Sequence, residues 1–368
     1  MKKTFLLFLL FIVILISFLL FHDTGNAMSK PYLEKLINKQ LGEGKEVVVK
    51  QLAVDLGKMR ATLLYNQTST IEVEGDYSLL MQSFDLDYRV ALKDFKYKNI
   101  ELTEQVDATG HAKGSYDVST KELNMLYDVN ISDLSKLQPI TKQKLHGSML
   151  VNGEVKKKEG LTTITGTTKE LEGKLDFQLE NKLFTMQMEG VSVEKIMQML
   201  RYPSVFRAYL KGEGEYRLTE KKGELNSTLV EAQLLPNGLI ELIKKVNGRD
   251  LSKEKFDEST LTATVEQSRI DFNFLAKNSN TLIRVSPARL ETDKNYIDAQ
   301  YTVEIEGKDV GGKIVGDIKE PHISVDSSRF IQNEVNNVID KNSEKLKEFG
   351  IGEKEQKKVK DFFNSLFK

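Results

Sequence analysis

Strict alternation of apolar and polar residues is the feature that most limits what this chain can fold into. Between positions 297 and 305 the odd-numbered residues are Ile, Ala, Tyr, Val and Ile, and the even-numbered ones are Asp, Gln, Thr and Glu. The stretches 70–75, 83–92 and 270–274 follow the same period of two. Because this period places all apolar side chains of a strand on one face, we predict antiparallel sheet with one dry and one wet face.

Short segments with a helical period interrupt the strand pattern, and a last strand is expected at 313–323. We predict four such helices, at 29–41, 133–140, 193–200 and 238–246. In the first, Ser29 is the expected N-cap and Pro31 lies in the first turn. Similar strand starts at residues 121, 173 and 223 recur at a period of roughly fifty. They indicate either stacked repeats in one long curved sheet or polar hairpins of similar composition.

The N-terminus carries the clearest targeting signal. Lys2 and Lys3 precede an apolar run from Phe5 to Phe21 that only Ser17 interrupts. Roughly 17 residues make a helix of about 26 Å, close to the thickness of a bilayer core. A retained transmembrane anchor fits this length, while small residues at 25–27 leave a cleaved signal peptide open. In either case the lysines stay cytoplasmic and the chain after residue 22 is exported.

The end of the chain returns to a helical period. Two apolar stripes follow residue 327, and lysines surround the second. These helices either cap the sheet or form a basic amphipathic surface that touches a membrane. We therefore predict three parts: a signal anchor at 1–27, an elongated β-sheet domain with short helices at 28–326, and amphipathic helices at 327–368.

Composition narrows the chemistry. Lys and Arg number 53 against 54 Asp and Glu, a formal net charge of -1, so no global charge attracts nucleic acid. The chain has no Cys, which excludes disulfides, thiol nucleophiles and Cys-based metal sites. The segment 307–313 imitates a phosphate-binding loop, but Ile314 follows its lysine, and a hairpin turn explains it better. We assign no catalytic residue, cofactor or metal, and an exported hydrolase remains a minor alternative.

The second half of the chain resembles the C-terminal part of the AsmA-like, TamB-related family of bacterial envelope proteins. The resemblance rests on a helix at 239–246, the segment 256–263, the strand 297–307, and a closing strand at 315–326 with a late proline. It implies a single-pass inner-membrane protein with its bulk in the periplasm and a strongly bent, taco-like sheet around an apolar groove. It also implies a role in phospholipid movement and outer-membrane integrity, without catalytic residues. The chain is short for a complete bridge across the periplasm.

The apolar face of such a sheet must be covered by protein or by ligand. Nine residues are the candidate lining of a lipid groove: Phe84, Leu86, Tyr88, Val90, Phe272, Phe274, Tyr301, Val303 and Ile305. The first hypothesis is that they bind phospholipid or another acyl-chain lipid. The alternative is a packed core in an assembly factor that binds another envelope protein through its sheet edge or its C-terminal helices.

Overall fold

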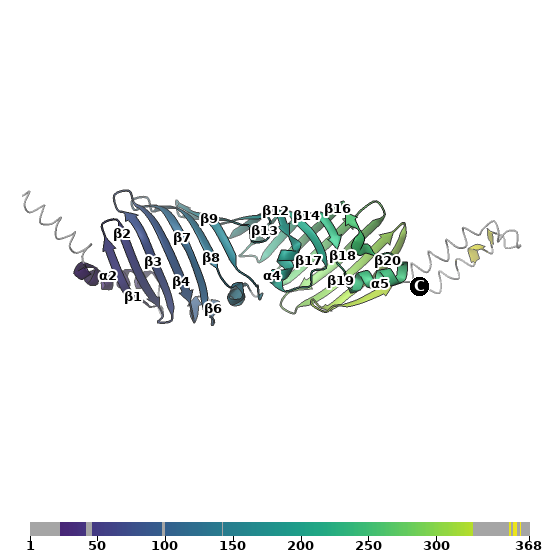
Figure 1. Cartoon of the computed structure of the whole chain (residues 1–368), viewed down its shortest axis with the longest axis horizontal. Helices are drawn as coiled ribbons and strands as arrows, with labels where there is room; N and C mark the ends of the chain where they lie inside the picture. Colours follow the sequence, from purple (N-terminus) through teal and green to yellow (C-terminus); the bar gives the residue numbers. More distant parts are fainter. Residues whose placement is uncertain are drawn as a thin grey trace, which may run out of the picture. The chain divides into compact units, whose positions relative to one another are not determined.

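The protein is mainly β. The computed structural model describes residues 23–41, 46–97, 100–141 and 143–326, together with 353–354, 356–358 and 361. Within them, 19 strands belong to one antiparallel sheet, and two short strands pair separately (Figure 1). The predicted fold class is therefore confirmed as a large antiparallel sheet with few short helices. The predicted apolar run at 5–21 and nearly all of the predicted C-terminal helices lie outside the described residues.

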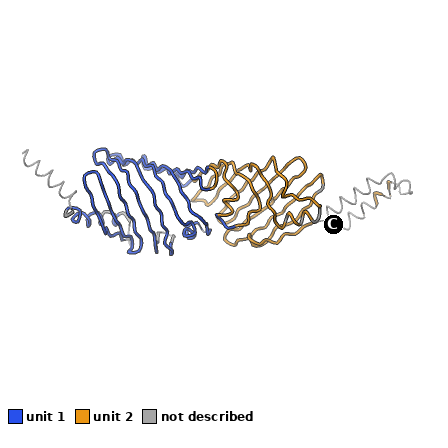
Figure 2. Tube along the Cα trace, in the orientation of Figure 1, with its two compact units in different colours: residues 1–170, 174–183, 199–201 blue, residues 171–173, 184–198, 202–368 orange. Residues whose placement is uncertain are grey.

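The range predicted as one domain falls into two compact units (Figure 2). Unit 1 comprises residues 1–170, 174–183 and 199–201, and unit 2 the remainder. In unit 1 each strand of the large sheet pairs with the next one along the chain, except that β4 pairs with β7. Its strands are β1 (Val47–Asp55), β2 (Lys58–Tyr65), β3 (Ser69–Ser78), β4 (Ser83–Leu92), β5 (Phe95–Tyr97), β6 (Ile100–Leu102), β7 (Val106–Asp117), β8 (Glu122–Ile131), β9 (Met149–Lys158), β10 (Leu161–Thr168) and β11 (Lys174–Glu180).

Unit 2 continues the meander from β13 to β21, with β16 paired to β14 beside the two-residue strand β15. Its strands are β12 (Leu183–Ser192), β13 (Phe206–Arg217), β14 (Lys222–Leu234), β15 (Lys255–Phe256), β16 (Glu258–Glu266), β17 (Arg269–Lys277), β18 (Thr281–Glu291), β19 (Tyr296–Ile305), β20 (Lys308–Asp317) and β21 (His322–Asp326). Pairing of consecutive strands keeps connections short, which accounts for the regular spacing of turns in the sequence.

The predicted internal helices are confirmed. The helices described are α2 (Asp23–Leu41), η1 (Leu134–Leu137), α3 (Gln138–Thr141), α4 (Val193–Leu200), α5 (Gly238–Asn247) and η2 (Leu251–Lys253). Asp133 begins the first of the predicted internal segments by accepting a hydrogen bond from the backbone N–H of Ser135. Such a side-chain cap satisfies a backbone donor that the helix itself leaves unpaired.

The predicted start of the first helix is wrong. α2 begins at Asp23, six residues before Ser29, and Pro31 lies inside it. The hydroxyl of Ser29 donates to the carbonyl oxygen of Gly25 within the helix instead of capping its end. The earlier start brings Asn26 into reach of Val54 on β1, to which its side-chain amide both donates and accepts a hydrogen bond. The helix therefore starts before Ser29 because its first turn contacts β1, and this contact cannot be predicted from the local sequence pattern.

The whole of α2 protects the outer edge of β1. Side chains spaced four residues apart bond to the β1 backbone, namely Asn26 to Val54, Lys30 to Lys50, Glu34 to Val49 and Asn38 to Val47. The four bonded strand residues extend over most of β1, from Val47 to Val54. Backbone donors or acceptors of Val47, Val49, Lys50 and Val54 are thereby occupied, which opposes pairing of this edge with a further strand.

The predicted last strand at 313–323 is also wrong, because the segment forms parts of two strands. β20 ends at Asp317, and β21 starts at His322 and folds back on it. The carboxylate of Asp317 accepts a hydrogen bond from the backbone N–H of Lys319, and Pro321 closes the turn. Aspartate followed shortly by proline is typical turn chemistry, which the apolar residues on both sides obscured.

Unit 2 contains a buried core around β19. Tyr301, Val303 and Ile305 on β19 are only 2%, 0% and 2% exposed. Val303 is paired with two further buried residues, Ile283 on β18 and Val310 on β20. The hydroxyl of Tyr301 donates to the carbonyl oxygen of Ser324 at 3.0 Å. These side chains thus form a core in which the polar atom of the tyrosine is satisfied.

Burial of Tyr301 predicts a loss of stability at alkaline pH. Desolvation raises its pKa from 10.0 to about 12. Between those values the unfolded chain releases the phenolic proton while the folded chain keeps it, so unfolding becomes easier by about 2 kcal/mol as pH rises from 10 to 12. In urea unfolding, Tyr301→Phe is expected to be less stable at neutral pH by about 1 kcal/mol, through the lost hydrogen bond, and to lose less between pH 9 and 11.5. Parallel curves for the two chains would contradict this.

Candidate functional site

The apolar residues of unit 1 line up in register across many strands. Val73 on β3 lies opposite Tyr88 on β4, which lies opposite Gly110 on β7. Gly110 in turn lies opposite Val129 on β8, and Val129 opposite Val151 on β9. Figure 1 shows β2, β3, β4, β7 and β8 lying side by side. Because paired residues point to the same side of a sheet, these rows form one continuous apolar surface, which we call the unit 1 apolar face.

The side chains of this face are half-buried, and none of those named is fully buried. Its larger members are Ile71, Val73, Phe84, Leu86, Tyr88, Val90, Met125, Tyr127, Val129, Val151, Val155, Ile164, Phe177 and Leu179. In the described part of unit 1, the most extensive helix–strand contacts are those of α2 with β1 and of α3 with β6, neither of which is among the strands that carry these side chains. A contiguous apolar surface of this extent that keeps contact with solvent is characteristic of a binding surface.

Tyrosine rings lie across glycines in this face. An added Cβ at Gly110 would come within 2.6 Å of the Tyr88 hydroxyl, and the hydroxyl donates to the carbonyl oxygen of Asp128, beyond Gly110, at 2.7 Å. Tyr127 spans Gly153 in the same way and donates to the carbonyl oxygen of Thr165 at 3.0 Å. Burial is the main cause that raises the pKa of both tyrosines. The face is therefore flat where it would otherwise carry projecting side chains.

The opposite face of the same strands is charged. His111 on β7 lies 2.8 Å from Asp85 and 2.9 Å from Asp87, both on β4, and Lys113 lies 2.6 Å from Asp85. The hydrogen bond to Asp87 is the main cause that raises the pKa of His111 above its ordinary value of 6.5. These side chains are substantially exposed, so the ion pairs contribute little stability. These strands therefore carry apolar side chains on one face and charged side chains on the other.

The nine predicted lining residues divide into three groups. Phe84, Leu86, Tyr88 and Val90 lie together on the unit 1 apolar face. Phe272 and Phe274 are half-buried in unit 2, where the ring of Phe274 meets that of Phe206 edge to face at 5.1 Å. The three residues of β19 belong to the buried core described above, so the structure gives them no open surface for a ligand.

Sequence reasoning missed the part of the face contributed by β8 and β9. Exposed leucines on the wet side, Leu126 and Leu150, break the alternation there and hide the pattern. A usable signal was present in β7, where Ala108, Gly110, Ala112 and others of similar size occupy every second position. Small residues at a period of two indicate a strand over which neighbouring side chains fold.

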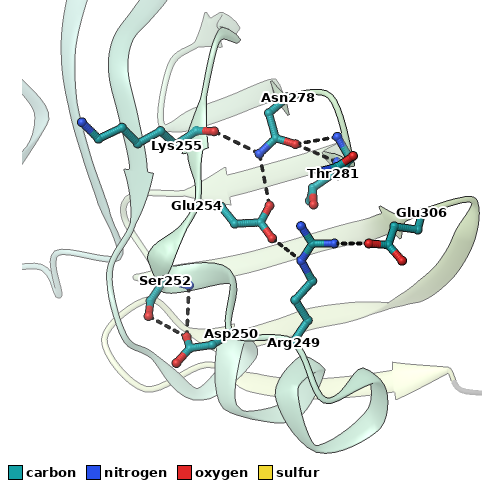
Figure 3. A network of polar contacts seen from close by, with 9 residues as sticks. Arg249, Asp250, Ser252, Glu254, Lys255, Asn278, Thr281 and Glu306 are labelled. Carbon is teal, nitrogen blue, oxygen red and sulfur yellow. Dashed lines mark hydrogen bonds and ion pairs between the residues drawn. The ribbon is translucent and has the colours of Figure 1, made fainter.

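A cluster of polar side chains in unit 2 joins the segment after α5 to two hairpin turns (Figure 3). The Arg249 guanidinium lies 2.6 Å from Glu254 and 2.8 Å from Glu306. The side-chain amide of Asn278 donates to Glu254 at 3.1 Å, and its oxygen accepts from the backbone N–H of Thr281. Arg249, Glu254 and Glu306 each have a partner of opposite charge, so we interpret the cluster as a structural clamp between η2 and the turns after β17 and β19.

No helix within the described residues is both long and apolar enough to cross a membrane. Comparison with known proteins identifies no relative, because no family model, no curated protein and no solved structure matches the chain.

Proposed function

We propose that the unit 1 apolar face binds the acyl chains of phospholipids. The chain would be a non-enzymatic, membrane-anchored protein of the bacterial periplasm that holds or passes lipid in support of the outer membrane. The observation that carries the proposal is the continuous, half-buried apolar face across β3, β4 and β7 to β11. The apolar run at 5–21 and the resemblance to AsmA-like proteins support the cellular setting.

The chemistry of the face favours an acyl chain over a polar ligand. The hydroxyl groups of Tyr88 and Tyr127 already donate to backbone carbonyls, so they are committed to the sheet. A sugar or an extended peptide would need hydrogen-bond partners that aliphatic side chains do not offer. An acyl chain needs none, and each buried methylene contributes about 0.8 kcal/mol. A flat floor over Gly110 and Gly153 suits such a ligand because it offers contact area without projecting groups.

The alternative is an assembly factor that binds another envelope protein through its sheet edge or its C-terminal helices, without lipid in the core. At the β1 edge, strand addition loses support, because α2 side chains already bond to the backbone of Val47, Val49, Lys50 and Val54.

The test of the proposal is the lipid content of the purified protein. The full chain would be purified in detergent from bacterial membranes, and its organic extract analysed by mass spectrometry. We expect phospholipid to remain with the chain in a stoichiometric amount after gel filtration. A chain that folds and retains no phospholipid would contradict the proposal.

A further inference from the structure

Five large apolar side chains project from three hairpin turns that lie at one end of the unit 1 strands. Leu56 in the β1–β2 turn is 82% exposed, and Leu80 in the β3–β4 turn is 92% exposed. Leu79, Met81 and Val118 are 67%, 73% and 68% exposed, the last in the β7–β8 turn. We call these five residues the apolar rim. Turn tips usually carry polar residues and glycine, so turn chemistry does not account for the rim.

The three turns are neighbours in space. The backbone N–H of Tyr77, which precedes the β3–β4 turn, donates to the carbonyl oxygen of Gly57 in the β1–β2 turn at 2.9 Å. Gln82, at the end of the β3–β4 turn, accepts hydrogen bonds from Tyr116 and Val118 at 2.9 and 2.8 Å. The rim is thus one contiguous surface of exposed apolar tips and not three separate features.

The turns at the opposite end of the same strands are polar. The β2–β3 turn there consists of Asn66, Gln67 and Thr68, and Lys93 and Asp94 follow β4. The turns at both ends connect the same strands, so the difference comes from the residues placed in the turns. An asymmetry of this kind indicates that one end meets an apolar environment and the other meets water.

The start of α2 lies beside the apolar rim. Asn26, in the first turn of α2, exchanges two hydrogen bonds with Val54, two residues before Leu56, at 3.1 and 3.2 Å. The apolar run predicted to span the membrane ends at Phe21, only two residues before α2 begins. The segment expected in the bilayer therefore joins the described structure beside the rim.

We propose that the apolar rim inserts into the surface of the bilayer that holds the chain's own N-terminal segment. The proposal rests on the membrane anchoring in the proposed function and adds the surface that contacts the lipid. Phe84 on the unit 1 apolar face lies two residues after Gln82, so insertion brings one end of that face to the bilayer. Acyl chains then have a short path from the membrane to the sheet.

The charges beside the rim favour insertion without a need for anionic lipid. The exposed ionic residues that flank the three turns are of both signs, namely Asp55, Lys58, Asp76, Asp117 and Lys121. A polybasic surface would have indicated electrostatic attraction to anionic headgroups, and the residues that flank these three turns do not form one; the exposed Lys156, Lys157 and Lys158 precede the separate β9–β10 turn. The rim is therefore expected to insert into vesicles of phosphatidylcholine alone.

The test uses site-specific fluorescence in the full chain, which has no native cysteine. Leu80→Cys in the rim and Lys93→Cys at the opposite end of the strands would each carry an environment-sensitive dye, in chains reconstituted into phosphatidylcholine vesicles. We expect a severalfold greater quenching by doxyl-labelled lipid at position 80 than at 93, and the reverse order with aqueous iodide. Both sites are exposed, so labelling leaves the fold intact.

Three outcomes would overturn the inference. Equal quenching at the two positions would place the rim in water. A shielded dye at position 80 that doxyl-lipid does not quench would mean that the rim contacts protein. A chain that does not float with the vesicles would remove the anchoring on which the inference rests. Failure of lipid binding by the apolar face is separate, because retained phospholipid is measured independently of the dye.

Discussion

Val129→Asp is expected to lower the phospholipid retained by the purified full chain at least tenfold. Val129 lies within the unit 1 apolar face, between Gly110 on β7 and Val151 on β9, and is half-buried. A carboxylate at this position would lose its hydration if an acyl chain covered it. Burying it costs several kcal/mol, and about 1.4 kcal/mol already corresponds to a factor of ten in affinity. The measurement is phospholipid per chain by mass spectrometry of the organic extract.

Leu126→Asp is the matched control. Leu126 lies on the same strand, three residues away, but points to the wet face and is 59% exposed. The two variants carry the same new charge, so lipid bound to the N-terminal segment or to the detergent belt is common to both. We expect Leu126→Asp to retain the parent amount. Equal retention by the two variants would show that the apolar face does not hold the lipid.

Gly312→Ala is expected to destabilise unit 2 by about 2 kcal/mol or more, because inserting a methyl group into a packed site typically costs about 1–3 kcal/mol. An added Cβ at Gly312 would lie 1.9 Å from the carbonyl oxygen of Ser324 and 2.6 Å from the hydroxyl of Tyr301. The Tyr301 ring is only 2% exposed and its hydroxyl is bonded to Ser324, so it cannot swing aside. The backbone of β20 or β21 must move instead. Urea unfolding measures the difference.

Gly311→Ala provides the control from the neighbouring position. The nearest atom to an added Cβ at Gly311 is the carbonyl oxygen of Tyr301 at 3.5 Å, an ordinary contact. We expect a change within about 0.5 kcal/mol, as for surface substitutions in general. Similar unfolding midpoints for the two variants would mean that the ring of Tyr301 does not lie across Gly312.

The sequence predicted the parts of the fold that depend on local pattern. The strand expected at 83–92 has those bounds, as does the helix expected at 193–200. Both follow from hydrophobic periodicity within one segment, since a strand with a wet face must alternate whatever lies elsewhere. The same reasoning placed Phe84, Leu86, Tyr88 and Val90 on one face of β4.

Alternation does not say what covers the apolar side, and this limited the prediction of the site. The periodicity of β19 is the cleanest in the chain, yet Tyr301 and Val303 are buried while the equivalent residues of β4 stay half-exposed. Burial at a given strand depends on segments that are distant in sequence. The position of the Tyr88 ring across Gly110 is equally non-local, because it depends on the register of β4 against β7. The protection of β1 by α2 has the same origin.

Mapping where an acyl chain contacts the protein tests the central claim most directly. The full chain would be reconstituted with a phospholipid that carries a photoactivatable group on its acyl chain, and adducts would be located by mass spectrometry. We expect adducts on β4 and β8, at Leu86, Val90 and Val129, besides any within residues 5–21. Adducts at 5–21 alone, or on wet-face residues such as Arg89 and Asn130, would contradict lipid binding by the apolar face.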